Sequence, residues 1–340
     1  MSFKRFDPQD IVISAESITS PVWSNSVIEL STFFTSSAQV AGASGAYYYN
    51  IYQTASDDTT AAVQFSVAYG DIVGSGSLDF NTAVPGASPS KTIYGQYRSL
   101  VLGDEEGKFI FGSETGSHFY VISLDRARYK EKLLPGTFSL LLSGSGESVL
   151  LNLTDNSQVS TTTNFNDAGR VFEVVSGSLG DVYTGVSETG HSAGSGSYGF
   201  FLPDIGVIIL NGKALDASAA DGGLNLGTIR TANTEGSGSE KIFEAIKNGG
   251  SFKLNSEETI SSNFVFVRAR NAEFNYSSNP SNTTGSGELR HNVMVNNPQS
   301  YATAVGLYND NNDLLATAKL SRPLLKDFTK EALVRIKLDF

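Results

Sequence analysis

The residues best suited to acid–base chemistry or metal binding are three histidines, and their spacing favours neither function. They are His118, His191 and His291, and no two of them form an HExxH or HxH pair. His191 lies in the run Thr189–Ser192, a glycine- and serine-containing loop, where a metal-binding or proton-transfer role would need partners that the sequence does not offer. We therefore interpret it as a polar loop residue, and we predict no metal site and no catalytic residues.

A glycine pattern at Gly194–Gly199 resembles the fingerprint of dinucleotide-binding proteins. The run reads GSGSYG and matches G-x-G-x-x-G. The fingerprint works when it follows a strand and opens a helix, because the helix N-terminus then faces the pyrophosphate. Here no clear strand precedes the run, no helix pattern follows it, and no βαβ unit surrounds it. We therefore predict no cofactor.

Acidic runs are the remaining candidates for ion binding. Asn309–Asp313 carries several side-chain oxygens, but a calcium loop also needs alternating ligands, a central glycine and a distal glutamate. Leu314 and Leu315 follow the run at once, and no such glutamate stands in register. A hairpin turn rich in Asn and Asp is the favoured interpretation. Asp57–Asp58 and Asp104–Glu106 are likewise interpreted as acidic turns.

Aromatic residues carry the clearest signal for contacts with other molecules. Four tyrosines, Tyr47, Tyr48, Tyr49 and Tyr52, stand in one expected strand, whose successive side chains point to opposite faces. Tyrosine joins apolar area to a hydroxyl group, which suits interfaces. Two interpretations stay open: an assembly contact or glycan-binding platform, and a strand buried on both faces. The other interface candidates are Trp23, Phe328 and Phe340.

Strand patterns dominate the elements that must position these residues. In Ala62–Tyr69 the apolar residues alternate, as in a half-buried strand. Phe264, Phe266, Arg268 and Arg270 share one face of another expected strand. Leu333, Arg335, Lys337 and Asp339 share one face of the last. The further expected strands are Asp10–Ser14, Val27–Thr32, Tyr47–Tyr52, Lys108–Phe111, Phe119–Leu124, Phe138–Leu142, Ser148–Leu153, Val171–Val175, Val207–Leu210, Phe264–Arg270, Ala302–Tyr308, Leu314–Leu320 and Leu333–Phe340.

Helix patterns are few. The clearest is Ser239–Lys247, with a serine N-cap and a stop at Asn248–Gly250. A second short helix is expected at Ser36–Gly45 or Arg126–Leu133, and Leu324–Glu331 is one helical turn or a loop. Five Gly-Ser-Gly tripeptides at irregular spacing indicate exposed loops rather than a repeat.

These patterns predict a mainly β fold of antiparallel sandwich type, with few short helices and two domains. We expect residues 1–214 to form an N-terminal β-rich domain and residues 215–239 a polar linker or loop. Residues 240–340 are expected to form a C-terminal β-rich domain with one helix at its start.

Composition limits the classes of function. The 340 residues include no cysteine and carry a net charge of −11, with no cluster of Lys and Arg that would neutralise phosphates. We therefore expect no nucleic-acid binding, no disulfides and a protein made in a reducing cytoplasm. The N-terminus shows no apolar segment after its basic residues, and no apolar run reaches about 18 residues. Neither a secretory signal nor a membrane span is expected.

Several segments resemble a virion structural protein of contractile-tailed marine and cyanobacterial phages, the myoviruses. The resemblance is strongest at Val305–Asn309 and Leu314–Glu331, and it extends to Phe6–Val12, Thr19–Ser24 and Phe274–Pro280. It implies a place in the virion, in the tail and most plausibly the baseplate region. A neck or capsid-surface position stays open. None of these segments is a catalytic signature.

The leading hypothesis is thus a structural subunit, not an enzyme, which contacts other virion proteins in several symmetric copies after assembly in the host cytoplasm. An alternative is a receptor- or glycan-binding module of tail-fibre type that contacts the host surface. A third is a hydrolase of surface polysaccharide, for which the many carboxylates of a β-rich chain are the only argument. Retaining glycosidases need two carboxyl groups about 5 Å apart, a distance that the sequence does not show.

Overall fold

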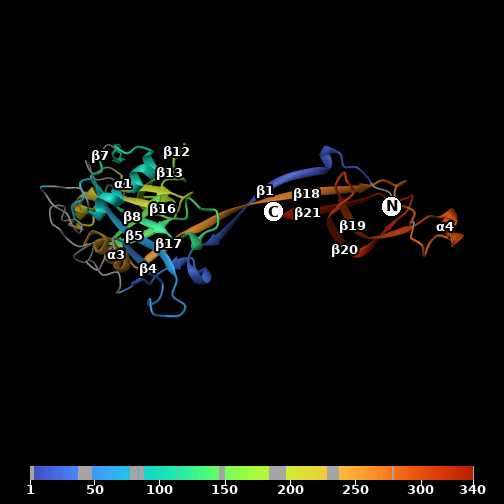
Figure 1. The fold of residues 1–340 in the computed structure, drawn as a ribbon, viewed down its shortest axis with the longest axis horizontal. Helices are drawn as coiled ribbons and strands as arrows, with labels where there is room; N and C mark the ends of the chain where they lie inside the picture. Colours follow the sequence, from blue (N-terminus) through green and yellow to red (C-terminus); the bar gives the residue numbers. More distant parts are fainter. Residues whose placement is uncertain are drawn as a thin grey trace. The chain divides into compact units, whose positions relative to one another are not determined.

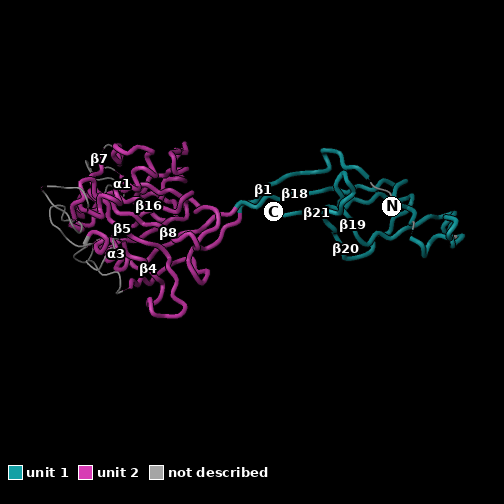
Figure 2. The backbone as a smooth tube through the Cα atoms, viewed as in Figure 1, with its two compact units in different colours: residues 1–17, 259–340 teal, residues 18–258 magenta. Residues whose placement is uncertain are grey.

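The chain forms two compact units (Figures 1 and 2). The computed structural model describes residues 4–36, 48–76, 83, 88–112, 114–144, 150–183, 197–227, 237–277 and 279–339. Unit 2 comprises Ile18–Glu258, and unit 1 comprises Met1–Ser17 with Thr259–Phe340. Strands predominate and all described strand pairs with a register are antiparallel, which confirms the predicted fold class.

The division into units differs from the predicted one. Residues 215–239 were expected to separate two domains, but they belong to unit 2, where Leu215, Leu224 and Leu226 are buried in the core. The units instead divide within two strands, β1 (Ile11–Pro21) and β18 (Asn255–Ala269), which pair with each other. The reason is that this pairing joins segments far apart in the sequence, which composition along the chain cannot reveal.

Unit 2 is built on one curled sheet. Its main path runs in the order β2 (Glu29–Leu30), β17 (Ser251–Lys253), β10 (Ser139–Ser143), β11 (Leu150–Asp155), β13 (Gly169–Ser178), β15 (Gly199–Leu202), β16 (Val207–Asn211), β8 (His118–Leu124), β5 (Val63–Asp71), β4 (Tyr48–Tyr52) and β3 (Phe34–Thr35). Strands β2 and β3 are the two ends of this path, yet only residues 31–33 separate them in the sequence. The sheet must therefore curl until its two ends approach each other.

The remaining elements of unit 2 are short. They are β6 (Ile110–Phe111), β7 (Glu114–Thr115), β9 (Lys132–Leu133), β12 (Asn164–Asn166), β14 (Asp181–Val182), α2 (Gly212–Asp216), η2 (Ser24–Ser26), η4 (Arg126–Arg128) and η5 (Ala219–Asp221). The helix expected at Arg126–Leu133 is thus wrong, because one 3-10 turn leads directly into β9. The alternative at Ser36–Gly45 lies outside the described residues beyond Ser36.

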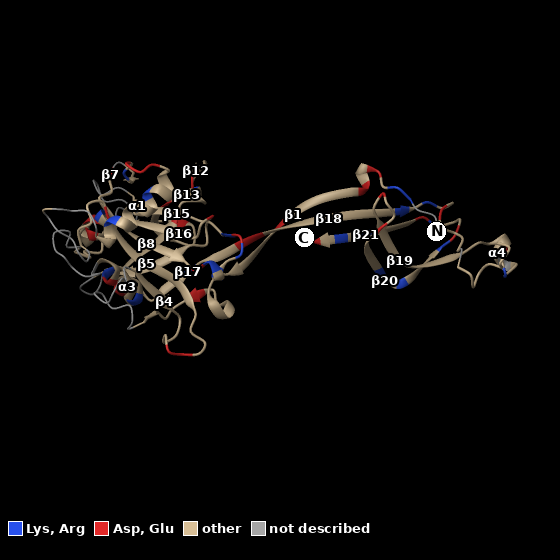
Figure 3. Ribbon diagram, viewed as in Figure 1, with Lys and Arg blue, Asp and Glu red and all other residues tan. Residues whose placement is uncertain are grey.

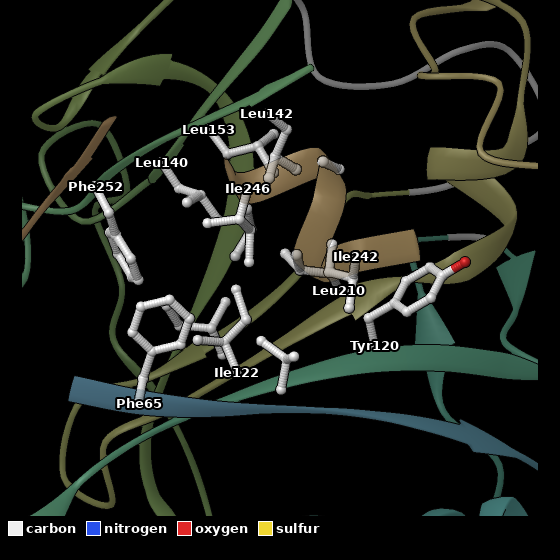
Figure 4. Packing of buried hydrophobic residues seen from close by; sticks show 14 of the residues in the cluster. Phe65, Tyr120, Ile122, Leu140, Leu142, Leu153, Leu210, Ile242, Ile246 and Phe252 are labelled. Atoms are coloured by element: carbon white, nitrogen blue, oxygen red, sulfur yellow. The ribbon is translucent and has the colours of Figure 1, made fainter. Parts of the chain in front are cut away.

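Helix α3 (Ser237–Gly249) packs against the concave side of this sheet and confirms the helix predicted at Ser239–Lys247. Ile246 lies near Leu140 of β10, and Ile242 lies beside Leu210 of β16 and Tyr120 of β8 (Figure 4). Gly249 permits this contact, because a Cβ there would lie 1.9 Å from the carbonyl oxygen of Leu141. The helix therefore ends where its backbone reaches β10.

The opposite side of the sheet is covered by α1 (Pro89–Leu102), a helix that is absent from the predicted elements. Tyr94 stacks on Phe119 of β8 with ring centroids 5.0 Å apart, and its hydroxyl donates to the carbonyl oxygen of Gly116 (3.0 Å). The sequence does mark both ends of α1. Proline occupies its first position, and Gly103 follows its last residue in the left-handed conformation. Because α1 and α3 cover opposite faces, β8 and β16 are buried on both.

Unit 1 contains two layers of strands. Strands β1, β18 and β21 (Ala332–Asp339) form a sheet, and β19 (Ser300–Tyr308) and β20 (Leu314–Lys326) form a hairpin that packs against it. Helix α4 (Val293–Asn296) and the 3-10 turn η1 (Pro8–Asp10) complete the described elements. No helical turn forms in Leu324–Glu331, because β20 continues to Lys326, and the loop alternative is the correct one for the residues that follow.

The buried carboxylate of Asp155 predicts a pH dependence for unit 2. It accepts hydrogen bonds from the backbone N–H groups of Gly136 (2.9 Å) and Ser157 (3.1 Å). Burial outweighs these bonds and raises the pKa of Asp155 above its ordinary value of 3.8. The folded state therefore holds this proton more tightly than the unfolded state. The resulting stabilisation is complete below pH 3.8 and is lost as the pH rises through the folded pKa.

The Asp155→Asn variant should lack this contribution while its amide oxygen still accepts from Gly136. The free energy of unfolding of the wild type should fall relative to the variant as the pH rises from below 3.8 to neutrality. The change is about 1.4 kcal/mol for each unit by which the folded pKa exceeds the unfolded one. Denaturant titrations of both proteins across this range measure it. A wild type that gains stability relative to the variant over the same range would contradict the prediction.

Candidate interaction surface

His118 occupies a structural position at the start of β8. It is 5% exposed, and its Nε2 lies 3.0 Å from Oδ2 of Asp216 while its Nδ1 lies 3.3 Å from Oγ of Ser117. The ring also lies against Tyr69, with centroids 6.0 Å apart, and a Cβ on Gly212 would be 2.1 Å from it. Both ring nitrogens lie within hydrogen-bonding distance of a partner, and the contact with Asp216 ties α2 to β8.

The described residues provide little support for an ion or small-molecule site. In these ranges no three His, Asp or Glu side chains are grouped as metal ligands, and His191 lies outside them. The run Asn309–Asp313 is a turn, in which Oδ1 of Asn309 accepts from the backbone N–H groups of Asn311 and Asp313. A depression beside Tyr276 and Met294 has room for about one water molecule.

Two of the predicted interface residues belong to the core of unit 2. Trp23 is 2% exposed, and its ring centroid lies 4.8 Å from that of Phe252. Tyr49 is buried and stacks on Phe243 of α3, 6.2 Å away. Neither side chain is accessible to a partner, because α3 and the curled sheet enclose both. For these two residues the interface prediction is wrong.

The other predicted interface residues differ in position. Tyr48 is exposed and Tyr52 is half-buried. Strand β4 therefore turns Tyr49 and Ile51 inward, and the alternate residues, Tyr48 and Tyr52 among them, outward. Phe328 in unit 1 is exposed. Tyr47 and Phe340 lie outside the described residues. The residues available for contacts are therefore Tyr48 and Phe328, with Tyr52 partly so.

Unit 1 has an unusually small apolar core. Among its described residues only Val265, Leu307 and Ile336 are buried apolar side chains, whereas unit 2 has 46. Twelve large apolar side chains of unit 1 are exposed, almost as many as the 14 of the larger unit 2. Those of unit 1 are Ile11, Val12, Ile13, Phe274, Tyr276, Val295, Tyr301, Tyr308, Leu314, Leu315, Phe328 and Leu333. Contiguous exposed apolar patches mark contact surfaces, so these twelve side chains are the candidates for such a surface in the described part of unit 1.

One face of the unit 1 sheet combines aromatic and basic side chains. The β18–β21 register pairs Phe264 with Lys337, Phe266 with Arg335, and Arg268 with Leu333, so these six side chains project from the same face. We call them the aromatic–basic face. The hairpin packs on the other face, around Val265 and Ile336, and no described residue forms a layer over the aromatic–basic face.

Charges on the aromatic–basic face are only partly paired. Lys337 lies 3.2 Å from both Glu16 and Asp339, and hydrogen bonds to these two carboxylates raise its pKa. The guanidinium of Arg335 lies 5.1 Å from the centre of the Phe264 ring. Arg335 and Arg268 are exposed and have no carboxylate within 4 Å among the described residues. Two cations are thus available to a partner.

The two units differ strongly in charge. Unit 1 contains 11 Lys and Arg against 10 Asp and Glu, and unit 2 contains 13 against 25, so their net charges are +1 and −12. Figure 3 shows the basic residues of β21 in blue, whereas β19 and the segment around α4 are almost uncharged. The negative charge of the chain therefore belongs to unit 2.

No protein-family model, curated protein or solved structure matches this chain. None of the helices in the described residues combines the length and apolar composition that a membrane-spanning helix needs. The sequence patterns of the two strands already placed Phe264, Phe266 and Arg268 on one face and Leu333, Arg335 and Lys337 on another. The sequence did not reveal that these two sets of side chains project from the same face of one sheet.

Proposed function

We propose that the chain is a structural subunit of a multi-protein assembly, in which unit 1 is buried against neighbouring subunits. The resemblance of both chain ends to virion proteins of contractile-tailed phages supports the proposal that this assembly is a virion and that the subunit belongs to its tail or baseplate region. The observation that carries the proposal is the contrast in unit 1 between three buried and twelve exposed large apolar side chains.

The size of unit 1 explains why this contrast matters. A domain of about 100 residues normally buries well over half of the surface of its unfolded chain. Unit 1 leaves the strands β1, β19, β20 and β21 largely exposed. Burial of apolar area is the main favourable term in folding and in obligate association. Neighbouring subunits would supply the apolar cover that unit 1 lacks.

The strand edges of unit 1 support the same function. Among the described strands, β1 and β21 are the outer strands of their sheet, and β19 and β20 pair only with each other. Unpaired edges accept strands from other chains, which is a common way to join subunits and an aggregation hazard in a free monomer. An assembly that covers these edges removes the hazard.

The proposal predicts that exposed apolar residues of unit 1 are needed for assembly and those of unit 2 are not. Leu315 of unit 1 is 68% exposed and Leu150 of unit 2 is 62% exposed, so aspartate at either position should change the free energy of unfolding by less than about 0.5 kcal/mol. Leu315→Asp should reduce incorporation into virus particles by tenfold or more. Burying the unpaired aspartate charge in the interface would cost roughly 2 kcal/mol or more of binding free energy. Leu150→Asp should be incorporated normally.

Quantitative mass spectrometry of purified particles measures this, in the virus that encodes the chain and with each variant replacing the wild type. Multiple copies of the wild-type chain per particle are expected. A chain that is made in infected cells but absent from particles would refute the structural role. Binding of the free chain to host glycans would instead favour the receptor-binding alternative.

A further inference from the structure

We infer that the aromatic–basic face of unit 1 binds the acidic unit 2 of a second copy of this chain. The contact joins different surfaces of the two copies, so each subunit uses its unit 1 on one neighbour and offers its unit 2 to another. This inference names the partner of unit 1 and rests on the structural role proposed above.

The chemistry of the face sets what can bind there. Phe264 and Phe266 are half-buried and Leu333 is 60% exposed, so together they present an apolar strip. Arg268 and Arg335 flank this strip without carboxylate partners among the described residues. Arginine and aromatic residues are the types most enriched at interface centres, where arginine pairs bidentately with carboxylates. The expected partner surface is therefore acidic with apolar side chains among the charges.

Charge identifies that partner as unit 2. Two aromatic–basic faces brought together would set arginines against arginines, and like charges at an interface cost several kcal/mol. Unit 2 carries a net charge of −12 against +1 for unit 1, so the attractive pairing is between unlike units. In an assembly that contains several copies of the chain, each neighbouring copy brings its own unit 2.

The symmetry of the contact has a structural consequence. An interface between unlike surfaces leaves one free binding surface on each added copy, so it propagates until a ring closes or a filament grows. Rings of copies are what a symmetric tail or baseplate contains. A contact between like surfaces would stop at a dimer.

Charge reversal in the full-length chain tests the interface. Arg335→Glu should weaken self-association at least tenfold in sedimentation velocity, since it replaces a cation that meets carboxylates by an anion. Lys319→Glu is the matched control, because Lys319 is an exposed cation on the hairpin of unit 1. Its replacement by glutamate changes the net charge by the same amount as Arg335→Glu. It should associate like the wild type. Equal effects of both variants, or a wild type that stays monomeric up to its solubility limit, would overturn the inference.

Photo-crosslinking identifies the surface that is bound. A photoreactive p-benzoylphenylalanine at position 333, in an equal mixture of light and heavy isotope-labelled full chains, distinguishes contacts between copies from those within one. Crosslinks between copies should join position 333 to residues 18–258, and adding Arg335→Glu should remove them. Crosslinks between copies that join position 333 to unit 1 would refute the assignment. Multimers that give no crosslinks between copies from position 333 would refute it as well. A chain that is present in particles but unaffected by Arg335→Glu would refute this contact alone and leave the proposed function standing.

Discussion

Replacing Lys326 by methionine is expected to unfold unit 1 and leave unit 2 folded. Lys326 is 2% exposed, and its ammonium group donates to the carbonyl oxygens of Asn271 (2.9 Å) and Asp327 (3.1 Å) and to Oδ1 of Asn275 (2.8 Å). Methionine keeps the length of the side chain but leaves these acceptors without a donor. Each unsatisfied buried acceptor costs about 1–3 kcal/mol, so the free energy of unfolding of unit 1 should fall by about 3–5 kcal/mol.

The small core of unit 1 makes this loss decisive. Only three fully buried apolar side chains, with partly buried ones around them, join its two layers in the described residues, and Lys326 ties the end of β20 to the segment that follows β18. Hydrogen–deuterium exchange of the full chain should show loss of protection in residues 259–339 while residues 18–258 stay protected. Lys319→Met, at an exposed position on the same strand, should leave exchange unchanged. Equal protection of unit 1 in both variants would show that the buried ammonium contributes little.

Replacing Phe252 by alanine is expected to destabilise unit 2 by about 3–5 kcal/mol, the usual cost of a large cavity in a packed core. Phe252 is fully buried, and its ring lies within 6.0 Å of the rings of Trp23, Phe65 and Phe138. These residues come from β17, β5, the segment after β1 and the residue just before β10, so one ring joins parts of the chain distant in sequence. The cavity would open where the two ends of the curled sheet approach.

Tryptophan fluorescence provides the measurement for Phe252→Ala. Trp23 is the single tryptophan of the chain and packs directly on Phe252, so its emission reports unfolding of unit 2. Denaturant titration should give a lower midpoint for the variant. Phe165→Ala is the control, because Phe165 is exposed and its loss should change stability by less than about 0.5 kcal/mol. A midpoint for Phe252→Ala equal to that of this control would contradict the role assigned to the aromatic cluster.

Local patterns predicted the elements well where residues act through their neighbours in sequence. The alternation in Ala62–Tyr69 became β5, and the serine cap and glycine stop around Ser239–Lys247 became the ends of α3. Helix α1 was missed because Thr92, Gly95 and Ser99 are weak helix formers and lower the helical propensity of the segment. Its stability comes from stacking on Phe119, a contact with a strand that lies after it in the sequence.

Long-range pairing limited the prediction of domains. Composition suggested a linker at residues 215–239, because Gly, Ala and Asn are frequent there. The three leucines of that segment are buried in the core of unit 2, and the division between units instead follows the pairing of β1 with β18, more than 200 residues apart. Pairing between distant strands leaves no local signature in either one.

The sequence by itself determined which residues alternate on each strand of the aromatic–basic face. Strand geometry alone sets Phe264, Phe266 and Arg268 on one side of β18, and Leu333, Arg335 and Lys337 on one side of β21. Only the tertiary structure decided that these sides coincide and stay uncovered. The reason is that the register between the strands is a long-range choice, made when Val265 and Ile336 turn together toward the hairpin and leave the basic residues to face a partner.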